Sequence, residues 1–512
     1  MVSHIKSFAF SGLNVIEVDV QVHVMSGMPS FTIVGLADKA VTESRERVRT
    51  ALSAIGLALP PKRITVNLSP ADLQKEGSHF DLPIALGLLC NLGAITQESV
   101  ANHAVLGELS LDGKITPVSG ILPAAIGATA REFGIICPSK NGREACWAGD
   151  LDIIAPNSLL ELINHLKGLD IIPRPNVPPK GQGIGVTYPD MKDIKGQATA
   201  KRALEITAAG GHNLLMTGPP GSGKSMLAKR LPSILPPLES DEILEVSMVK
   251  SIVGQLVGGD ISCERPFRDP HHNCSMPALV GGGSKAKPGE VTLAHKGILF
   301  LDELPEFPRQ VLDSLRQPLE TKEISVARVQ SHVTYPSDFQ LIAAMNPCRC
   351  GYLDDASRAC SKAPRCAVDY QSKISGPLLD RIDIHVDVPA INPMDIYKQT
   401  ESESSEDVRK RVKYARDIQK ERNRNNPEPN KYLNSYLDGE ELFLACNLEK
   451  SARDLLEQAV SKMGLSMRGH NRVLRVARTI ADLEGSKDVT HRHLAESLNF
   501  RQLSFKKDKS FA

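Results

Sequence analysis

The sequence predicts an α/β protein with a phosphate-binding unit in its middle and a helical C-terminal part. Strand-like and helix-like segments alternate between residues 16 and 92. A glycine-rich loop at residues 218–225 lies between an apolar run and a helix-like stretch, which is the order of a strand, a phosphate-binding loop and a helix. Beyond residue 407 the apolar residues have helical spacing. The 512 residues allow two to four domains of about 150 residues each.

The composition is that of a globular protein. Hydrophobic residues make up 41% and charged residues 24% of the chain, which is enough for ordinary cores. The formal net charge of +1 identifies no polyanionic partner, so any basic surface must be local. We find no secretory leader pattern and no apolar run near the roughly 18 residues of a membrane span. We therefore expect a cytoplasmic protein without membrane partners, whose ten cysteines serve as thiols or metal ligands.

Residues 1–170 are expected to form an N-terminal α/β domain. Residues 16–24 alternate between apolar and polar side chains, which is typical of a half-buried strand. The other signals of the domain are strands at 32–35 and 64–68 and helices at 38–55 and 81–92. Residues 171–189 are rich in proline and glycine and predict a linker.

The phosphate-binding loop predicts a nucleotide site. Backbone N–H groups and the N-terminus of the following helix face the phosphates in such loops. Lys224 would reach the β- and γ-phosphate oxygens of ATP, and the Ser225 hydroxyl would hold Mg²⁺. The expected nucleotide-binding residues are Gly218, Pro219, Pro220, Gly221, Ser222, Gly223, Lys224 and Ser225.

Two further apolar runs end in polar side chains that suit hydrolysis. The run at 297–303 ends in Asp302, expected in the Mg²⁺ shell, and Glu303, expected to orient or deprotonate the attacking water. The alternative is an Asp–Glu pair that caps a helix. The run at 339–345 leads to Asn346, whose amide would position the same water. This order of elements resembles the AAA+ ATPases, which implies an ATPase core with a parallel sheet over residues 190–397.

Residues 376–385 resemble the magnesium-chelatase/MCM branch of AAA+ more closely. The resemblance implies that Arg381 is an arginine finger and that Arg468 is a sensor-2 arginine that binds nucleotide. The alternative for Arg381 is a surface ion pair with Asp380 or Asp383. Three more arginines share the helix predicted around Arg468: Arg472, Arg475 and Arg478.

The N-terminal domain carries its own resemblance. Residues 76–85 and 106–121 are similar to the end of the Lon peptidase domain, which has a ribosomal-S5-like fold. Lon-type peptidases use a Ser–Lys dyad, but the matched lysine position holds Leu122, and the serine position falls at or beside His79, next to Ser78. A serine without its lysine is a poor nucleophile. We therefore expect a scaffold without peptidase activity, which serves oligomerisation or forms a ring that contacts DNA.

The whole chain, with a helical lid expected over residues 406–505, resembles the YifB/ComM family of magnesium-chelatase-like proteins. The stretches 265–272 and 299–307 are the most similar. The resemblance implies a homo-hexameric, ATP-dependent DNA helicase that promotes branch migration during homologous recombination of incoming DNA in natural transformation, with recombination proteins as candidate partners. The alternatives are a magnesium-chelatase-type AAA+ subunit and a protein-remodelling ATPase.

Four cysteines fall close together: Cys348, Cys350, Cys360 and Cys366. Four thiolates suit tetrahedral Zn²⁺. The segment 348–366 is otherwise polar and has no core of its own, so a metal would stabilise it. Four reduced thiols in a loop are the alternative, and the clustering favours zinc.

A candidate DNA contact lies at residues 323–335. These residues alternate on both sides of a short polar turn, which predicts a hairpin. The AAA+ branch named above points such a hairpin into the pore of its ring, so the resemblance implies that Arg328, Gln330 and Ser331 touch DNA phosphates. Aromatic residues make up only 4% of the chain, which favours phosphate contacts over base stacking.

Two other segments carry expectations of their own. The glycine-rich segment 257–288 contains His271 and His272 and is expected to be structural or to add a second pore element. The basic segment 408–424 is expected to be the solvated face of a helix.

Overall fold

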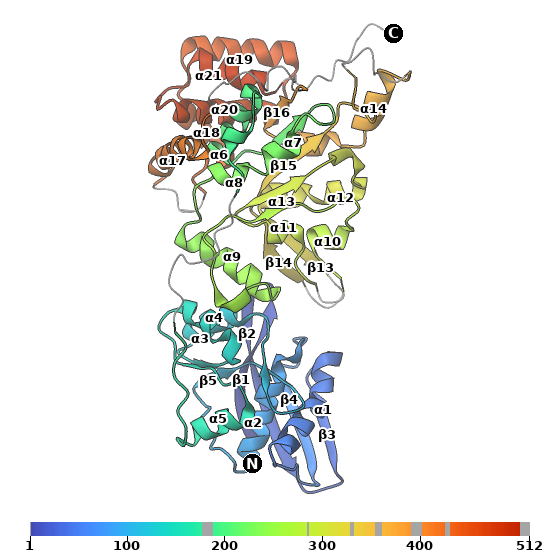
Figure 1. Ribbon diagram of the computed structural model, residues 1–512, viewed down its shortest axis with the longest axis vertical. Coiled ribbons are helices and arrows are strands. Elements are labelled where there is room, and N and C mark those ends of the chain that lie inside the picture. Colours follow the sequence, from blue (N-terminus) through green and yellow to red (C-terminus); the bar gives the residue numbers. More distant parts are fainter. Residues whose placement is uncertain are drawn as a thin grey trace.

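The computed structural model describes residues 2–176, 188–283, 286–327, 332–353, 361–390, 402–424 and 431–501. The molecule is elongated, with the N-terminal region at one end, a five-stranded sheet in the middle and C-terminal helices at the other end (Figure 1). The predicted α/β fold class is confirmed. The division into domains stays a prediction, and most of the expected linker at 171–189 lies outside the described residues.

The N-terminal region is built on a seven-stranded mixed sheet in the order β3-β4-β2-β1-β5-β8-β9. In β2 the valines at 18, 20 and 22 are buried, as the period-two pattern predicts. Helix α1 begins at Asp38, whose carboxylate accepts the Val41 backbone N–H at 2.7 Å. The elements are β1 (Val2–Ser11), β2 (Asn14–Met25), β3 (Ser30–Val34), α1 (Lys39–Ala54), β4 (Arg63–Ser69), α2 (Asp81–Asn91), β5 (His103–Val105), β6 (Glu108–Leu109), β7 (Ile115–Thr116), α3 (Ile121–Thr129), β8 (Gly134–Ile136), α4 (Ser139–Ala145), β9 (Ile153–Ile154) and α5 (Leu159–Leu166).

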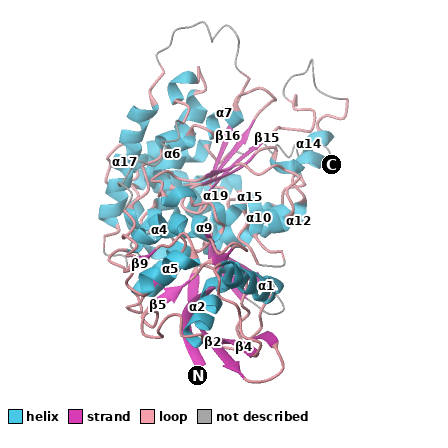
Figure 2. Ribbon diagram, turned by 60° about the horizontal axis from the view of Figure 1, so that its bottom comes forward, coloured by secondary structure: helices cyan, strands magenta, loops and turns pink. Residues whose placement is uncertain are grey.

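The central region is a parallel sheet in the order β11-β12-β15-β10-β16. Helices cover both of its faces (Figure 2), so the sheet has a core on each side. The side chains of β10 alternate between these two cores: Leu214 and Met216 face one, and Leu215 faces the other. The elements are α6 (Ala198–Gly210), β10 (Leu214–Thr217), α7 (Lys224–Ala228), α8 (Leu231–Ile234), α9 (Ser240–Ile252), β11 (Phe267–Arg268), α10 (Met276–Val280), α11 (Glu290–Leu293), β12 (Ile298–Leu301), η5 (Leu304–Glu306), α12 (Arg309–Ser314), α13 (Arg316–Thr321), β13 (Glu323–Ala327), β14 (His332–Pro336), β15 (Gln340–Met345), α14 (Arg365–Gln371), α15 (Gly376–Leu379) and β16 (Ile384–Asp387).

The C-terminal region consists of helices that share a core of their own and also pack on α6. They are α17 (Ser405–Arg422), α18 (Gly439–Cys446), α19 (Lys450–Met463), α20 (Met467–Leu483) and α21 (His491–Asn499). The expectation of a solvated basic face at 408–424 is wrong for part of α17. Arg416 is buried and donates to the Ala208 carbonyl at 3.0 and 2.7 Å, because the last carbonyls of α6 attract a cation.

The N-terminal region is attached to the central region through helix α9 (Figure 1). The Ser251 carbonyl, near the end of α9, accepts the Gly120 N–H at 3.0 Å, and the Ser251 hydroxyl donates to the buried Glu144 carboxylate at 2.5 Å. The Trp147 indole donates to the Gly259 carbonyl at 2.8 Å. These contacts position the N-terminal region relative to the sheet.

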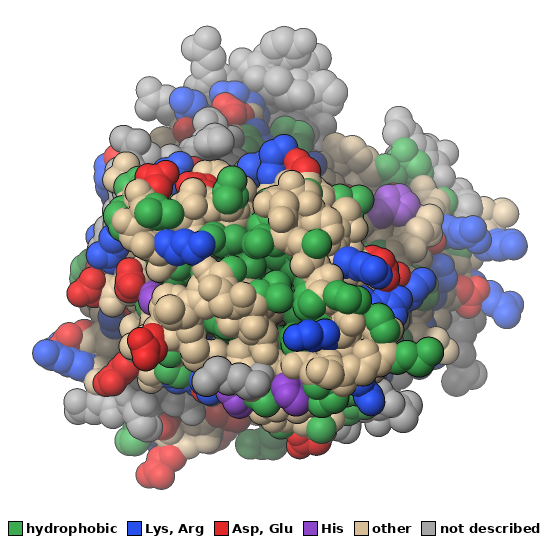
Figure 3. Space-filling view, turned by 90° about the horizontal axis from the view of Figure 1, so that it is seen from below, with side chains coloured by type: hydrophobic (Ala, Val, Ile, Leu, Met, Phe, Trp, Pro, Cys, Tyr) green, Lys and Arg blue, Asp and Glu red, His purple; other side chains and the backbone are tan. Residues whose placement is uncertain are grey.

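The free end of the N-terminal region is a mixed surface (Figure 3). Hydrophobic side chains gather near its middle among tan backbone and other side chains, and charged side chains of both signs are scattered over the face. Met28 and Leu36 are among the exposed hydrophobic side chains of this region, 89% and 57% accessible. None of the described helices has the length and apolar character needed to cross a membrane.

Candidate active site

The ends of three neighbouring strands meet in one cleft. β10 pairs with β15 and β15 pairs with β12, all in parallel, so their carboxyl ends share one edge of the sheet. The cleft at this edge has a volume of about 370 Å³. It is lined by residues 220–226 of the glycine-rich loop and α7 together with Asp302, Glu303, Met345 and Asn346. The structure thus brings together the three segments that the sequence analysis selected.

The glycine-rich loop wraps closely around the end of β10. Gly218 lies against the Val388 carbonyl so tightly that a Cβ atom would come within 2.1 Å of that oxygen. The Lys224 ammonium is largely buried and donates to the carbonyls of Gly218 and Pro219 at 2.8 and 3.0 Å. Burial lowers the pKa of Lys224, and the nearby carboxylates of Asp302 and Glu303 oppose that shift. The ammonium is therefore held inside the cleft, near the two acidic side chains.

Asp302 connects the loop to the end of β12. Its Oδ2 accepts the Ser225 hydroxyl at 2.6 Å, and its Oδ1 accepts the Glu303 backbone N–H at 2.9 Å. A hydroxyl and a carboxylate at this spacing are hard oxygen ligands, the type that Mg²⁺ prefers beside phosphates. The donor set of Ser225 and Asp302 therefore fits a magnesium ion.

Glu303 has a left-handed backbone conformation, with φ of +52°, and its side chain is 54% exposed. This conformation is uncommon for a residue with a Cβ and is found at functional sites. The His272 Nδ1 atom lies 3.5 Å from the Glu303 carboxylate. Both residues also line a second hollow of about 300 Å³, together with residues 269–271 and Asp302.

His272 is a site residue that the sequence analysis did not assign. The histidine pair was expected in a structural or pore element, whereas the structure places His272 beside the candidate catalytic base. The pair follows β11, which is the parallel neighbour of β12. The position of His272 near Glu303 can be predicted only once the strand order is known. Parallel neighbouring strands end at the same edge of the sheet, so the residues that follow β11 lie near those that follow β12.

Asn346 follows β15, the third strand that ends at the cleft. Its side-chain oxygen accepts the Lys224 ammonium at 3.2 Å, so the tip of β15 contacts the phosphate-binding loop directly. An amide held here faces the same cleft as Glu303. The geometry suits the predicted role of Asn346 in positioning water, which stays a prediction.

Arg381 and Arg468 lie away from this cleft and beside one another. The Arg381 guanidinium pairs with the Glu320 carboxylate, and its Nη1 donates to the Pro377 carbonyl at 2.6 Å. Arg468 approaches the same carboxylate of Glu320 at 4.0 Å and is 66% exposed. Neither arginine is among the described residues that line the cleft. The Arg381 side chain is only 11% exposed, so of the two only Arg468 is well exposed, and contact of either with nucleotide stays a prediction.

The alternative ion-pair partners of Arg381 are otherwise engaged. Asp383 lies 3.6 Å from Arg472, and Asp380 lies 4.0 Å from Arg501. Of the other arginines on α20, Arg475 donates to a backbone carbonyl and Arg478 pairs with an aspartate within the helix. This leaves Arg468 as the exposed arginine among the four on that helix.

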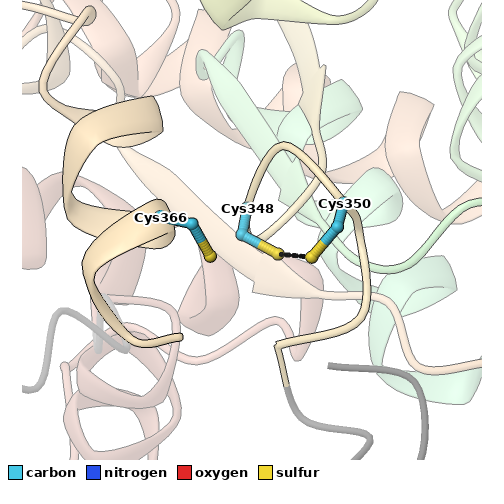
Figure 4. Close-up of side chains that lie close together, drawn as sticks. All are labelled: Cys348, Cys350 and Cys366. Carbon is cyan, nitrogen blue, oxygen red and sulfur yellow. Dashed lines mark hydrogen bonds between the residues drawn. The ribbon is translucent and has the colours of Figure 1, made fainter. Parts of the chain in front are cut away.

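Three of the four clustered cysteines meet. The thiol groups of Cys348, Cys350 and Cys366 all lie within 4.8 Å of one another, and Cys360 lies outside the described residues. Cys348 and Cys350 sit on one tight turn, and Cys366 projects toward them from α14 (Figure 4). The expectation that the whole segment is a loop is wrong at its end, because Pro364 precedes the first turn of a helix. Burial raises the pKa of the Cys348 thiol.

The predicted hairpin is present as β13 and β14, paired in an antiparallel register. Its proposed DNA-contacting residues, Arg328, Gln330 and Ser331, lie outside the described residues. In the N-terminal region the Ser78 hydroxyl bonds to the Glu108 carboxylate, and Leu122 is fully buried in α3. A buried leucine cannot act as the base of a Ser–Lys dyad.

Comparisons with known proteins match this chain over nearly its full length. The family profiles are "Magnesium chelatase, subunit ChlI" over residues 190–396, "Subunit ChlI of Mg-chelatase" over 20–141 and "Magnesium chelatase, subunit ChlI C-terminal" over 402–501. The competence protein ComM of Haemophilus influenzae is 42% identical over 502 residues, 97% of each chain. YifB of Escherichia coli is 40% identical over 494 residues, 96% of this chain and 95% of that protein. The magnesium-chelatase 67 kDa subunit of Chlorobaculum parvum is 27% identical over 171 residues, 32% of this chain and 25% of that protein.

Proposed function

Because this chain belongs to the YifB/ComM family of magnesium-chelatase-like proteins, we propose that it is an AAA+ ATPase that uses ATP hydrolysis to move DNA strands. One observation carries the proposal. The cleft at the sheet edge gathers a phosphate-binding lysine, a magnesium-type pair of Ser225 and Asp302, and an exposed Glu303 within reach of the same space. This is the set of groups that hydrolysis of a nucleoside triphosphate requires.

Each residue of the cleft has its own role in hydrolysis. The loop N–H groups and Lys224 bind the phosphates and offset their charge. Ser225 and Asp302 would hold Mg²⁺, which would offset more of the negative charge of the phosphates. The Glu303 carboxylate accepts a proton from the attacking water, or aligns it, and the Asn346 amide holds that water in line. His272, whose Nδ1 atom is 3.5 Å from the Glu303 carboxylate, positions that carboxylate.

The proposal makes the active unit an oligomer. Arg381 does not reach the cleft of its own chain, so it would complete the site of a neighbouring subunit, as an arginine finger does. A finger supplied head-to-tail around a closed ring gives a cyclic assembly, and we propose a hexamer. Arg468 lies beside Arg381 and would contact the same neighbouring nucleotide.

DNA is the proposed substrate of the movement. The hairpin β13–β14 precedes β15, whose tip carries Asn346, so a change at the nucleotide site reaches the hairpin through one short segment. The proposed contacts are DNA phosphates, with Arg328, Gln330 and Ser331 at the hairpin tip. ComM, 42% identical to this chain, is named for competence, which supports a role in natural transformation, with branch migration as the proposed reaction.

The same proposal assigns ATP and Mg²⁺ as cofactors and Zn²⁺ to the clustered cysteines Cys348, Cys350, Cys360 and Cys366, of which Cys360 lies outside the described residues. A chelatase-subunit role is less well supported, since the match to a magnesium-chelatase subunit covers only 32% of this chain.

Stimulation of ATP turnover tests the choice of substrate. We expect branched or single-stranded DNA at low salt to raise turnover, and neither a tetrapyrrole-bound partner nor unfolded protein to do so. Turnover that responds to unfolded protein but not to DNA would replace the DNA proposal with protein remodelling.

A further inference from the structure

We propose that metal binding at the cysteine site, defined as Cys348, Cys350 and Cys366, fixes the phosphate-binding loop and the tip of β15 in the positions that ATP binding and hydrolysis require. The ligand is a thiophilic divalent cation such as Zn²⁺. The inference rests on the proposed ATPase function. It adds that metal at the cysteine site regulates this function, because both the affinity for ATP and the rate of ATP turnover depend on the bound metal.

The thiols are close enough to share one ion. The sulfur atoms of Cys348 and Cys350 are 3.1 Å apart, and all three lie within 4.8 Å of one another. In tetrahedral zinc with Zn–S bonds of ~2.3 Å, sulfur atoms lie roughly 3.8 Å apart. Small side-chain adjustments therefore bring the three thiolates onto a common ion. Among the described residues, these three side chains are the group whose donor atoms lie close enough together to hold a metal ion.

The turn that carries two of these thiols is packed against the phosphate-binding loop. Its tightness comes from the Gly351 N–H, which donates to the Cys348 carbonyl at 3.0 Å. Gly351 has φ of +83° and touches Pro220, so that a Cβ at Gly351 would lie 2.4 Å from the Pro220 Cδ atom. Any movement of the turn therefore changes the space available to Pro220, which lines the nucleotide cleft.

The same turn follows directly on the tip of β15. Cys348 is two residues beyond Asn346, and the Asn346 amide accepts the Lys224 ammonium at 3.2 Å. The Pro347 carbonyl between them accepts the Gln371 side chain at 2.7 Å. Gln371 ends α14, the helix that carries Cys366 near its start. A metal that joins Cys366 to the turn would thus hold the segment 346–351 to α14 at a second point.

Helix α14 is also connected to the acidic end of β12. Lys373, just beyond the helix, lies 3.7 Å from the Glu306 carboxylate in the turn after Glu303. The cysteine site therefore lies in a frame whose members touch the phosphate-binding loop, the Asn346 tip and the Glu303 turn. Structural zinc contributes folding free energy to the segment that binds it. Loss of the metal would loosen this frame, and misplacement of catalytic groups by about 1 Å costs up to 10²-fold in turnover.

The test uses the full-length protein and three measurements: zinc content by mass spectrometry, affinity for a fluorescent ATP analogue, and ATP turnover. We expect about one zinc per chain. Cys366→Ser should lose the zinc, weaken ATP binding about tenfold and lower turnover by at least as much. Cys263→Ser, at an exposed cysteine elsewhere in the chain, is the matched control and should change none of the three.

Removal of zinc from the wild-type protein by a chelator, followed by its return, guards against a variant that fails to fold. Both ATP affinity and turnover should fall and then recover. Wild-type protein that binds no zinc, even after zinc is added, overturns the metal site. Zinc that can be removed without any change in ATP affinity overturns the coupling. A protein that hydrolyses no ATP but whose ATP affinity follows its zinc content would contradict the proposed function and support this inference.

Discussion

Replacing Arg381 by alanine should stop ATP turnover while leaving the fold and ATP binding of each subunit intact. In the structure the Arg381 guanidinium pairs with Glu320, whose side chain is 49% exposed, and donates to the Pro377 carbonyl. It does not line the cleft of its own chain. The two consequences of the substitution, on stability and on turnover, therefore have separate physical origins.

The magnitudes of the two effects separate them. An ion pair of this kind contributes about 0–1 kcal/mol and a hydrogen bond from a charged donor about 1.5–3 kcal/mol to stability, so the free energy of unfolding should fall by about 1.5–4 kcal/mol. An arginine finger contributes about 10³–10⁵ in turnover. That range corresponds to about 4–7 kcal/mol of transition-state stabilisation. Turnover should thus collapse at temperatures where the variant remains folded and binds ATP.

Mixed rings show whether the finger acts on a neighbour. A subunit with Arg381→Ala keeps its own Glu303, and a subunit with Glu303→Gln keeps its own Arg381. An interface is complete when the first supplies the cleft and the second supplies the arginine, which is one of the two possible orders. With random mixing in equal amounts, about a quarter of the interfaces would be complete, and turnover should recover accordingly. A mixture of Lys224→Ala and Glu303→Gln is the matched control, because no interface in it is complete.

Turnover of the Arg381→Ala protein within tenfold of wild type would remove Arg381 from the mechanism. Absence of recovery in the mixed rings, with assembly shown by sedimentation, would mean that Arg381 acts within its own chain or has a structural role.

Lys224→Ala should abolish ATP binding and nucleotide-dependent assembly, and retained turnover in a coupled assay would refute the proposed phosphate site. Glu303→Gln should bind ATP like wild type but hydrolyse it at least about 10²-fold more slowly, as seen by single-turnover kinetics; unchanged hydrolysis would exclude Glu303 as the base. His272→Ala should lower kcat about tenfold without changing ATP affinity, because its imidazole contacts Glu303 rather than the phosphate-binding loop; an equal loss of affinity would indicate a structural role. DNA binding should weaken at least tenfold between about 50 and 200 mM salt, and a salt-independent affinity measured by fluorescence anisotropy would argue against phosphate contacts.

The local parts of the fold follow from the sequence. The helix predicted at 38–55 is α1, which begins after the capping residue Asp38, and the strand before the glycine-rich loop is β10. These elements depend on residues near one another in the chain: a cap, an apolar period or a glycine turn. The three segments that line the cleft (the glycine-rich loop, the Asp302–Glu303 pair and Asn346) were also predictable, since each directly follows an apolar run.

Contacts between distant segments were not predictable in the same way. The pairing of Arg381 with Glu320 joins residues 61 positions apart, and the approach of His272 to Glu303 depends on β11 lying next to β12. Arg416 was expected in solvent because its neighbours are charged, yet it is buried against the end of α6. Tertiary packing sets such partners. It brings backbone carbonyls and carboxylates from distant parts of the chain next to these side chains, and the local sequence does not indicate which ones.

The central claim is that ATP hydrolysis in this cleft moves DNA strands. The most direct test is displacement of a labelled strand from a three-stranded DNA junction by the purified protein, with ATP and Mg²⁺ at low salt, beside the Lys224→Ala protein. We predict displacement by the wild-type protein only with ATP, and none by Lys224→Ala. Wild-type protein that hydrolyses ATP and binds the junction but displaces no strand, or that displaces it equally without ATP, would contradict the account.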